Sequence, residues 1–141
     1  MRMKDGCIFC AIATGKAPAF RVAEDDHAVA FLDIFPVADG HTLVIPKDHA
    51  ENVFEMEDGA IRSVAALVRR VARAIRAEIA PDGLAVCQAN GEAAGQTVWH
   101  YHQHLIPRRR GDSMSFHGRG KAEDARLRAL AASLAARIEP A

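Results

Sequence analysis

Short apolar runs separated by turn residues fill the first third of the chain. The runs at 20–24, 28–32 and 41–46 have the length and composition of β-strands. Pro36 interrupts the chain after the second run, because proline cannot donate to a strand ladder, and Gly40 marks a turn before the third run. The pattern therefore predicts three consecutive strands joined by short connections.

The apolar spacing becomes helical after residue 58. From 58 to about 80, apolar side chains recur every three or four residues, which predicts a long amphipathic helix. Two further strands are predicted at 84–88 and 98–106, and a second, alanine-rich helix at 123–138. We therefore expect an α+β domain whose sheet is mainly antiparallel and about five-stranded, with one long helix and a C-terminal helix.

Length and composition fit one domain. The chain has 141 residues, half of them hydrophobic, which is enough to build a buried core. We expect residues 1–110 to form the body of the domain and residues 111–141 to add a loop and a helix to it. Eighteen basic residues balance eighteen acidic ones, so the overall charge indicates neither a nucleic-acid nor a membrane partner. The run 108–110, three arginines, is a local exception.

The cysteines indicate metal or redox chemistry rather than a disulfide framework. There are three of them, no apolar stretch is long enough to span a membrane, and the start of the chain lacks the apolar run of a signal peptide. We therefore expect a cytoplasmic protein. Cys7 and Cys10 form a Cys-x-x-Cys pair, which leaves zinc, redox chemistry and free thiols open, although this segment lacks a βαβ context for redox chemistry. Zinc needs two more ligands, for which the chain offers His27, His49, His100 and His117.

Three histidines in strict alternation form the most informative motif. His100, His102 and His104 fall within the strand predicted at 98–106. Alternate residues of a strand point to the same face, with neighbours in such a row about 7 Å apart. Three adjacent imidazoles on a core face would be costly to desolvate. The row therefore indicates a functional site rather than three buried structural histidines.

Two chemistries compete for this row. One is a catalytic zinc held by all three histidines, with a metal-bound water as the nucleophile. The other is covalent catalysis, in which an imidazole attacks phosphorus. Gly91 and Gly95 place flexible backbone beside the row, which suits the approach of a phosphate, and Gln96 and Thr97 add neutral donors. No acidic residue lies within the motif. These surroundings favour the second chemistry.

The chain resembles the histidine triad (HIT) superfamily. Residues 90–107, which include the alternating histidines of 100–104, look like the family's signature, and 40–47 and 31–34 match its earlier blocks. The resemblance covers most of the chain and is closer to the Hint branch and its bacterial relatives than to the transferase branch. It implies the HIT-like fold and a homodimer. The tail 111–141 is longer than the Hint ending, and in the family the C-terminal segment helps to select substrates.

The resemblance implies roles for three histidines. His102 would attack the α-phosphorus of a nucleotide and form a nucleotidyl-imidazole intermediate. His104 would contact the phosphate and help to protonate the leaving group. His41 would reach the far nitrogen of His102 and fix its tautomer. A neutral imidazole nucleophile does need an oriented partner and a preorganised anion site.

The resemblance also implies a set of substrate contacts. Asp33 would accept hydrogen bonds from the ribose hydroxyls, and Ile34 would pack on the nucleoside. Asn90, Gln96 and Thr97 would hold phosphate oxygens. Without the family, Asp33 also fits an ordinary turn carboxylate ahead of a proline.

Zinc-bearing relatives in this superfamily suggest which histidines complete the cysteine pair. They use the histidine after the Pro-Lys turn and the first histidine of the row, which here are His49 and His100. With Cys7 and Cys10 these would make a closed tetrahedral site, typical of structural zinc.

Together these features predict a nucleotide hydrolase or transferase that acts at the α-phosphate through His102. Its ligand would be a purine nucleotide or a conjugate, that is, a nucleoside phosphoramidate, an adenylate or a dinucleoside polyphosphate. One alternative is a nucleotide-binding interaction module with little turnover. Another is the zinc hydrolase with all three row histidines on one metal.

Overall fold

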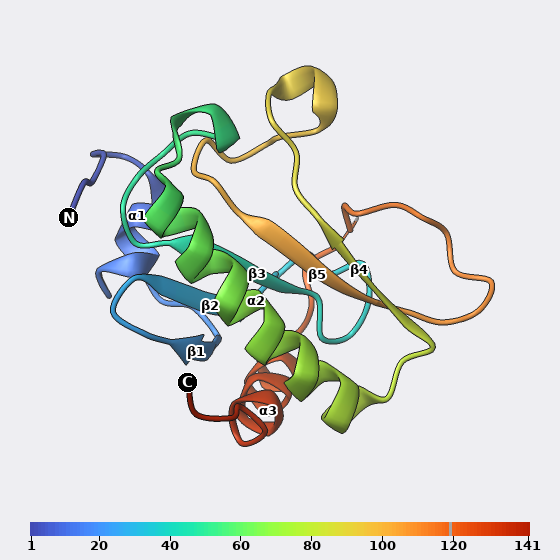
Figure 1. Cartoon of the computed structure of the whole chain (residues 1–141). Helices are drawn as coiled ribbons and strands as arrows, with labels where there is room; N and C mark the ends of the chain where they lie inside the picture. The colour runs from blue at the N-terminus through green and yellow to red at the C-terminus, as the bar shows by residue number, and fades with distance from the viewer. Residues whose placement is uncertain (119) are drawn as a thin grey trace.

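The computed structural model describes residues 1–118 and 120–141, which form a five-stranded antiparallel sheet and three α-helices (Figure 1). The strands lie in the order β1-β2-β3-β5-β4. Their bounds are β1 Arg21–Glu24, β2 Ala28–Leu32, β3 Thr42–Pro46, β4 Gly83–Cys87 and β5 Gln103–Arg108. The helices are α1 Ile8–Ala13, α2 Asp58–Ile79 and α3 Asp124–Ala135, and short 3-10 turns occupy Val53–Glu55 and Glu92–Ala94. The predicted α+β class is confirmed.

The two central N-terminal strands are buried on both faces, which explains why β2 and β3 are continuous apolar runs. Alternate residues serve two separate clusters. One face of the sheet packs with α2 and α3 through Ala28, Ala30, Leu32 and Val44. The other face packs with the short helix α1 through Val29, Phe31, Leu43 and Ile45. In Figure 1, α2 crosses the front of the sheet and α1 lies beside its β1–β2–β3 end.

The C-terminal tail braces the loop that follows β2. Leu127, Ala131 and Leu134 of α3 belong to the same hydrophobic cluster as α2. The Arg126 guanidinium pairs with the Asp39 carboxylate, and a backbone hydrogen bond of 2.9 Å joins the Ala122 amide to the Ile34 carbonyl. The tail therefore holds both ends of the loop between β2 and β3.

The last strand begins later than the sequence predicts. We expected it to run from 98 to 106, but β5 spans Gln103–Arg108 and contains only the last histidine of the row. The register pairs Val44 with Gln103, so Pro46 would lie opposite Tyr101 if the ladder continued. Pro46 has no N–H to offer, and the Tyr101 amide instead donates to the Ala50 carbonyl at 2.7 Å. The first two histidines therefore precede the strand.

Helix α1 was not predicted. It is only six residues long, and the side chain at its N-cap is that of Cys7, which accepts a hydrogen bond from the Cys10 amide. Cysteine is not among the residues that normally signal a helix start. Within the two described segments, no helix combines the length and the apolar character that crossing a bilayer requires.

Candidate active site and metal centre

Two histidines of the row line a cavity of about 460 Å³ on the α1 side of the sheet. The ring centroids of His102 and His104 are 5.0 Å apart. Most of the wall is apolar and is contributed by Phe9, Ile12, Phe31, Ile34 and Leu43. Asp33 and Thr97 also line it. We call this space the histidine cavity.

One backbone hydrogen bond sets the tautomer of His102. Its Nδ1 lies 2.7 Å from the carbonyl oxygen of His100. A carbonyl only accepts, so Nδ1 carries the proton and Nε2 keeps a free lone pair. Phe9 packs edge-on against the ring at 5.2 Å and 87°. The ring is thus held in the form that an imidazole nucleophile requires.

A relay of hydrogen bonds sets the tautomers of two further histidines. The Val37 amide donates to Nδ1 of His41 at 3.1 Å, so neutral His41 has its proton on Nε2. That Nε2 lies 2.9 Å from Nδ1 of His104, which must therefore accept. Neutral His104 is left with a proton on Nε2, and this residue lines the cavity. The implied contact between His41 and His102 is wrong, because His41 orients His104 instead.

Burial keeps these imidazoles neutral at physiological pH. It lowers the pKa of His41 to about 4 and that of His104 to about 3, with neighbouring cationic and imidazole groups acting in the same direction. Burial also lowers the pKa of His102. A neutral His102 keeps its lone pair for attack, and a neutral His104 still carries a donor.

Asp33 lies at the rim of the same cavity. Its Oδ1 accepts the Phe35 amide at 2.8 Å, as a turn carboxylate does, while Oδ2 lies 3.5 Å from Nε2 of His41. Burial raises the pKa of this carboxyl. Asp33, His41 and His104 could also be grouped as metal ligands. The bond from Val37 to Nδ1 of His41 argues against that grouping, because a neutral imidazole cannot accept at one nitrogen and ligate a metal through the other.

Two predicted phosphate contacts are not brought into the cavity. The Asn90 Oδ1 accepts the Val53 amide at 2.8 Å, and the Asn90 amide group is paired with that of Gln88. Gln96 accepts from the Gly91 amide and donates to the carbonyls of Glu51 and Val98. These side chains instead stabilise the loop that carries Thr97, which does line the cavity.

The C-terminal tail contributes two aromatic residues that sequence reasoning did not assign to the site. The Phe116 and His117 rings lie 5.6 and 6.1 Å from the ring of His104. Nε2 of His117 hydrogen-bonds to the Gly95 carbonyl at 3.0 Å, and His117 lines the cavity although it is exposed. The sequence offered no signal for this, since a lone histidine in a glycine-rich loop resembles any solvated one.

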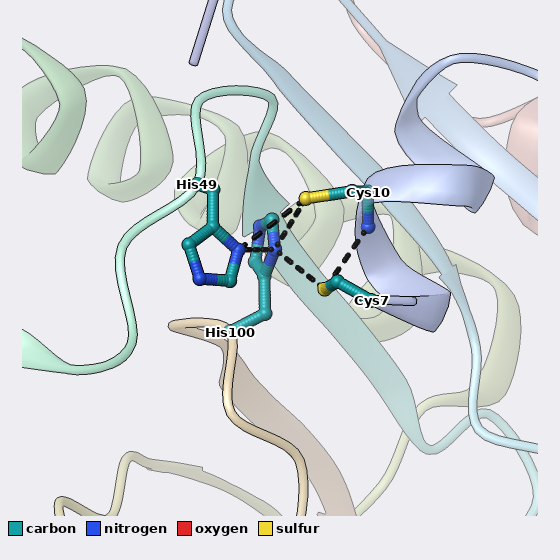
Figure 2. A group of neighbouring side chains, drawn as sticks. All are labelled: Cys7, Cys10, His49 and His100. Atoms are coloured by element: carbon teal, nitrogen blue, oxygen red, sulfur yellow. Dashed lines mark hydrogen bonds between the residues drawn. The ribbon is translucent and has the colours of Figure 1, made fainter. Parts of the chain in front are cut away.

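Figure 2 shows Cys7, Cys10, His49 and His100 turned toward a common centre. Their sulfur and Nδ1 atoms all lie within 4.8 Å of one another. Cys10 Sγ lies 3.3 Å from Nδ1 of His49, and Cys7 Sγ lies 3.4 Å from Nδ1 of His100. The structure thus assembles the four predicted ligands from three distant segments. His27 and His117 do not belong to this group.

The hydrogen bonds around this cluster fit a metal ion. Nε2 of His100 donates to the Pro46 carbonyl at 2.8 Å, so its Nδ1 is an unprotonated lone pair aimed inward. Nδ1 of His49 faces it at 3.2 Å. The amides of Lys4 and Cys10 each donate to a sulfur at 3.4 Å. Burial raises the pKa of the Cys10 thiol, and the Lys4 amide bond acts against that rise. Two imidazoles and two sulfurs make four ligands, the number and type that a tetrahedral Zn²⁺ site uses.

The row histidines divide between the two sites. His100 is the only one of the three grouped with the cysteines, among the described residues. The Nδ1 atoms of His102 and His104 are committed to other hydrogen bonds and their side chains line the cavity. The structure therefore does not group the three row histidines as ligands of one metal.

Comparison with known proteins agrees with this geometry. The model of the HIT domain family matches residues 14–111. Protein hit of Bacillus subtilis is 45% identical over 142 residues, covering 98% of each chain. The chain therefore belongs to the HIT domain family.

Two solved structures add detail. A hypothetical histidine triad nucleotide-binding protein from Sulfolobus tokodaii is 35% identical with a TM-score of 0.85, covering 93% of this chain and 91% of its own. A zinc-bound histidine triad family protein from Mycobacterium smegmatis is 42% identical with a TM-score of 0.79, covering 93% and 94%.

The buried histidines predict a loss of stability in mild acid. In an unfolded chain histidine takes up a proton near pH 6.5, whereas native His104 does so only near pH 3. Between these values the unfolded state binds more protons, so the free energy of unfolding falls as the pH falls below 6.5. From pH 7 to pH 5 we expect this fall to be smaller in His104→Asn than in the wild type, by up to about 2 kcal/mol, measured by urea denaturation.

His27→Asn is the matched control, because His27 is an exposed histidine outside the buried cluster. Its unfolding free energy should fall as much as that of the wild type. An equally large fall in His104→Asn would contradict a buried, neutral His104.

Proposed function

We propose that this protein transfers nucleotidyl groups from nucleotide conjugates to His102 and then to water. The observation that carries the proposal is the bond from Nδ1 of His102 to the His100 carbonyl, which leaves a neutral Nε2 lone pair at the cavity. The apolar wall, with the Asp33 carboxylate at its rim, suits a nucleoside. The name of the Sulfolobus relative, a nucleotide-binding protein, supports the same ligand.

The proposed chemistry has two steps. Nε2 of His102 forms a bond to the α-phosphorus while the bond from phosphorus to the leaving group breaks. The leaving group keeps the electron pair and takes a proton from water, while Nε2–H of His104 donates a hydrogen bond to the phosphate. Water then attacks phosphorus and gives up a proton to solvent, and the bond to His102 breaks with its electron pair returning to Nε2, which releases a nucleoside monophosphate.

The proposed substrates are purine nucleoside phosphoramidates, adenylates or dinucleoside polyphosphates. In this proposal Asp33 accepts from the ribose hydroxyls, Ile34 packs on the base, and Thr97 contacts the phosphate. A phosphate role for Asn90 or Gln96 would require their internal hydrogen bonds to be exchanged for the ligand. We therefore propose that they act by holding the Thr97 loop.

The competing proposal is a nucleotide-binding module with little turnover, since binding and catalysis use the same residues. The tautomer of His102 favours the enzyme, because binding alone does not require Nδ1 to be protonated and Nε2 to keep an unshared lone pair.

We also propose a homodimer, implied by the family. It is supported by β4, which pairs only with β5 among the described strands and leaves Val86 half-exposed at the sheet edge. A cytoplasmic location stays a prediction of the sequence.

We further propose that the Cys7, Cys10, His49 and His100 centre holds zinc in a structural role. Four protein ligands would close the coordination sphere and leave no position for a substrate or a reactive water. The side chains of Cys10, His49 and His100 are buried. The centre would then stabilise the fold of the segments that carry the nucleophile.

Removing the nucleophile should abolish turnover. We expect His102→Ala to lower kcat with adenosine 5′-phosphoramidate by about four orders of magnitude, because covalent catalysis is lost, while AMP binding persists. Rapid quench with the labelled conjugate should trap one adenylyl group per wild-type chain and none on the variant.

His27→Ala, outside the cavity, should keep both activity and the covalent adduct. A wild-type protein that binds AMP but forms no adduct and no product would support the binding module instead. A His102→Ala variant with wild-type kcat would disprove the assigned nucleophile.

Zinc should be lost with its ligands. We expect Cys10→Ser to carry less than one zinc per chain by elemental analysis and to melt at a lower temperature, because metal binding and folding are linked. Cys87→Ser is the control, since Cys87 is a half-buried cysteine of β4 outside the cluster. Purified protein that is stable without metal, with a melting temperature unaffected by chelators, would refute a structural zinc.

Asp33 should discriminate ribose from its deoxy analogues. A carboxylate can accept from two vicinal hydroxyls, and such bonds to a charged group predict at least about tenfold weaker binding of 2′,3′-dideoxy-AMP than of AMP. Asp33→Asn should reduce that ratio toward one, measured by calorimetry. Asp25 is a matched turn carboxylate, accepting the amides of His27 and Ala28, so Asp25→Asn should preserve the ratio. An unchanged ratio in Asp33→Asn would leave Asp33 as a turn residue only.

A further inference from the structure

A second hollow adjoins the histidine cavity. It has a volume of about 340 Å³ and is lined by residues 4–8 and 97–99. Three residues, Ile8, Thr97 and Val98, line both spaces, so the two hollows meet along this shared wall. We call the second hollow the Trp99 groove. Neither the nucleoside contacts nor the zinc ligands proposed above use it, apart from its edges at Thr97 and Cys7.

The groove presents flat apolar surface to solvent. The Trp99 side chain is 44% exposed and Ile8 is 51% exposed. An indole is large, and burying it is usually favourable, so an exposed one at the end of a groove indicates a contact surface. Ile8 belongs to the Cys-x-x-Cys segment, and Trp99 precedes the first histidine of the row. Both positions are therefore held by the same structure that holds His102.

The charges in the groove do not suit a chain of phosphates. Its cation is Lys4, whose ammonium lies 3.5 Å from the Glu51 carboxylate and is already compensated. Asp5 adds a carboxylate to the lining. A polyphosphate extending from the reacting phosphorus would meet this carboxylate without a free cation among the lining residues. An aromatic group would instead stack on the indole.

We propose that the Trp99 groove is the subsite for the leaving group and that it selects conjugates whose leaving group is aromatic and carries no phosphate. The proposal rests on the proposed function, because it presumes that the nucleoside occupies the histidine cavity. With the α-phosphate between His102 and Thr97, a leaving group that extends past Thr97 enters the groove. The substrate class is thus narrowed to aromatic amides or acyl esters of a nucleoside monophosphate, rather than dinucleoside polyphosphates.

Binding can be measured without turnover in His102→Ala, which lacks the proposed nucleophile. Trp99 is the only tryptophan of the chain, so its emission reports on the groove. The probe is the tryptophan emission of His102→Ala, titrated with AMP anilide and with unsubstituted adenosine 5′-phosphoramidate. We expect the anilide to quench the emission and to bind about tenfold more tightly than the unsubstituted compound. Equal affinities with no quenching by the anilide would overturn the subsite.

Turnover gives the second readout. Wild-type kcat/KM should be about tenfold higher for the anilide than for the unsubstituted amide. The value for diadenosine polyphosphates should be lower than that for the unsubstituted amide. In Trp99→Leu we expect the anilide to lose this advantage, so that the ratio of the two kcat/KM values falls toward one. Phe54→Leu is the control, because Phe54 is an 85% exposed aromatic residue outside the groove, and it should keep the wild-type ratio.

The outcomes separate this inference from the proposed function. Turnover of both amides with equal kcat/KM would overturn the leaving-group subsite and leave the proposed function standing, as would a preference for the polyphosphate. If Trp99→Leu lowers kcat/KM for both amides equally, or changes the oligomeric state as a subunit contact would, the subsite is also overturned. Absence of turnover and of AMP binding in the wild type would refute the proposed function itself.

Discussion

His100 connects every part of this site through three separate interactions. Its Nδ1 points into the cysteine cluster, its Nε2 donates to the Pro46 carbonyl, and its own carbonyl accepts the Nδ1–H of His102. The bond to Pro46 fixes the tautomer of His100 that metal ligation would require, and the bond to His102 fixes the tautomer that the proposed attack requires. A single residue therefore positions both the proposed metal centre and the proposed nucleophile, and the end of the β3–β5 ladder provides the space for it.

The Cys-x-x-Cys segment contributes to this arrangement with the residues between its cysteines. Phe9 packs edge-on against both His100 and His102, at 5.9 and 5.2 Å. Ile8 lies on the wall shared by the histidine cavity and the Trp99 groove. A metal that held Cys7 and Cys10 would thus also hold the apolar wall against the nucleophile. In this fold the proposed metal centre and the histidine cavity share one short helix.

A cluster of neutral imidazoles is costly to bury, and the fold offsets that cost with directed hydrogen bonds. Three ring nitrogens have a partner of fixed polarity: the Val37 amide for His41, the His100 carbonyl for His102 and the Pro46 carbonyl for His100. A backbone amide can only donate and a carbonyl can only accept, so the tautomers follow from the chain path. The same burial that lowers the pKa values keeps His102 nucleophilic at neutral pH.

Local patterns were sufficient for most of the fold. The apolar runs of β2 and β3 and the helical stripe of α2 were predicted with bounds within one residue, because strand and helix periods are properties of short segments. The four proposed metal ligands and the pair His102 and His104 were named from motif and resemblance together, and the structure brings each group together.

What the sequence by itself determined about this protein is its class of fold, its family and the residues available for chemistry. Only the tertiary structure decided how these residues are paired. It joined His41 to His104, used Asn90 and Gln96 inside a loop, and brought His117 to the cavity from a tail that no local pattern linked to it. The physical reason is that a hydrogen-bond partner distant in sequence depends on strand register and on where a ladder ends. Here Pro46, which cannot continue the ladder opposite Tyr101, decided where the histidine row leaves the sheet.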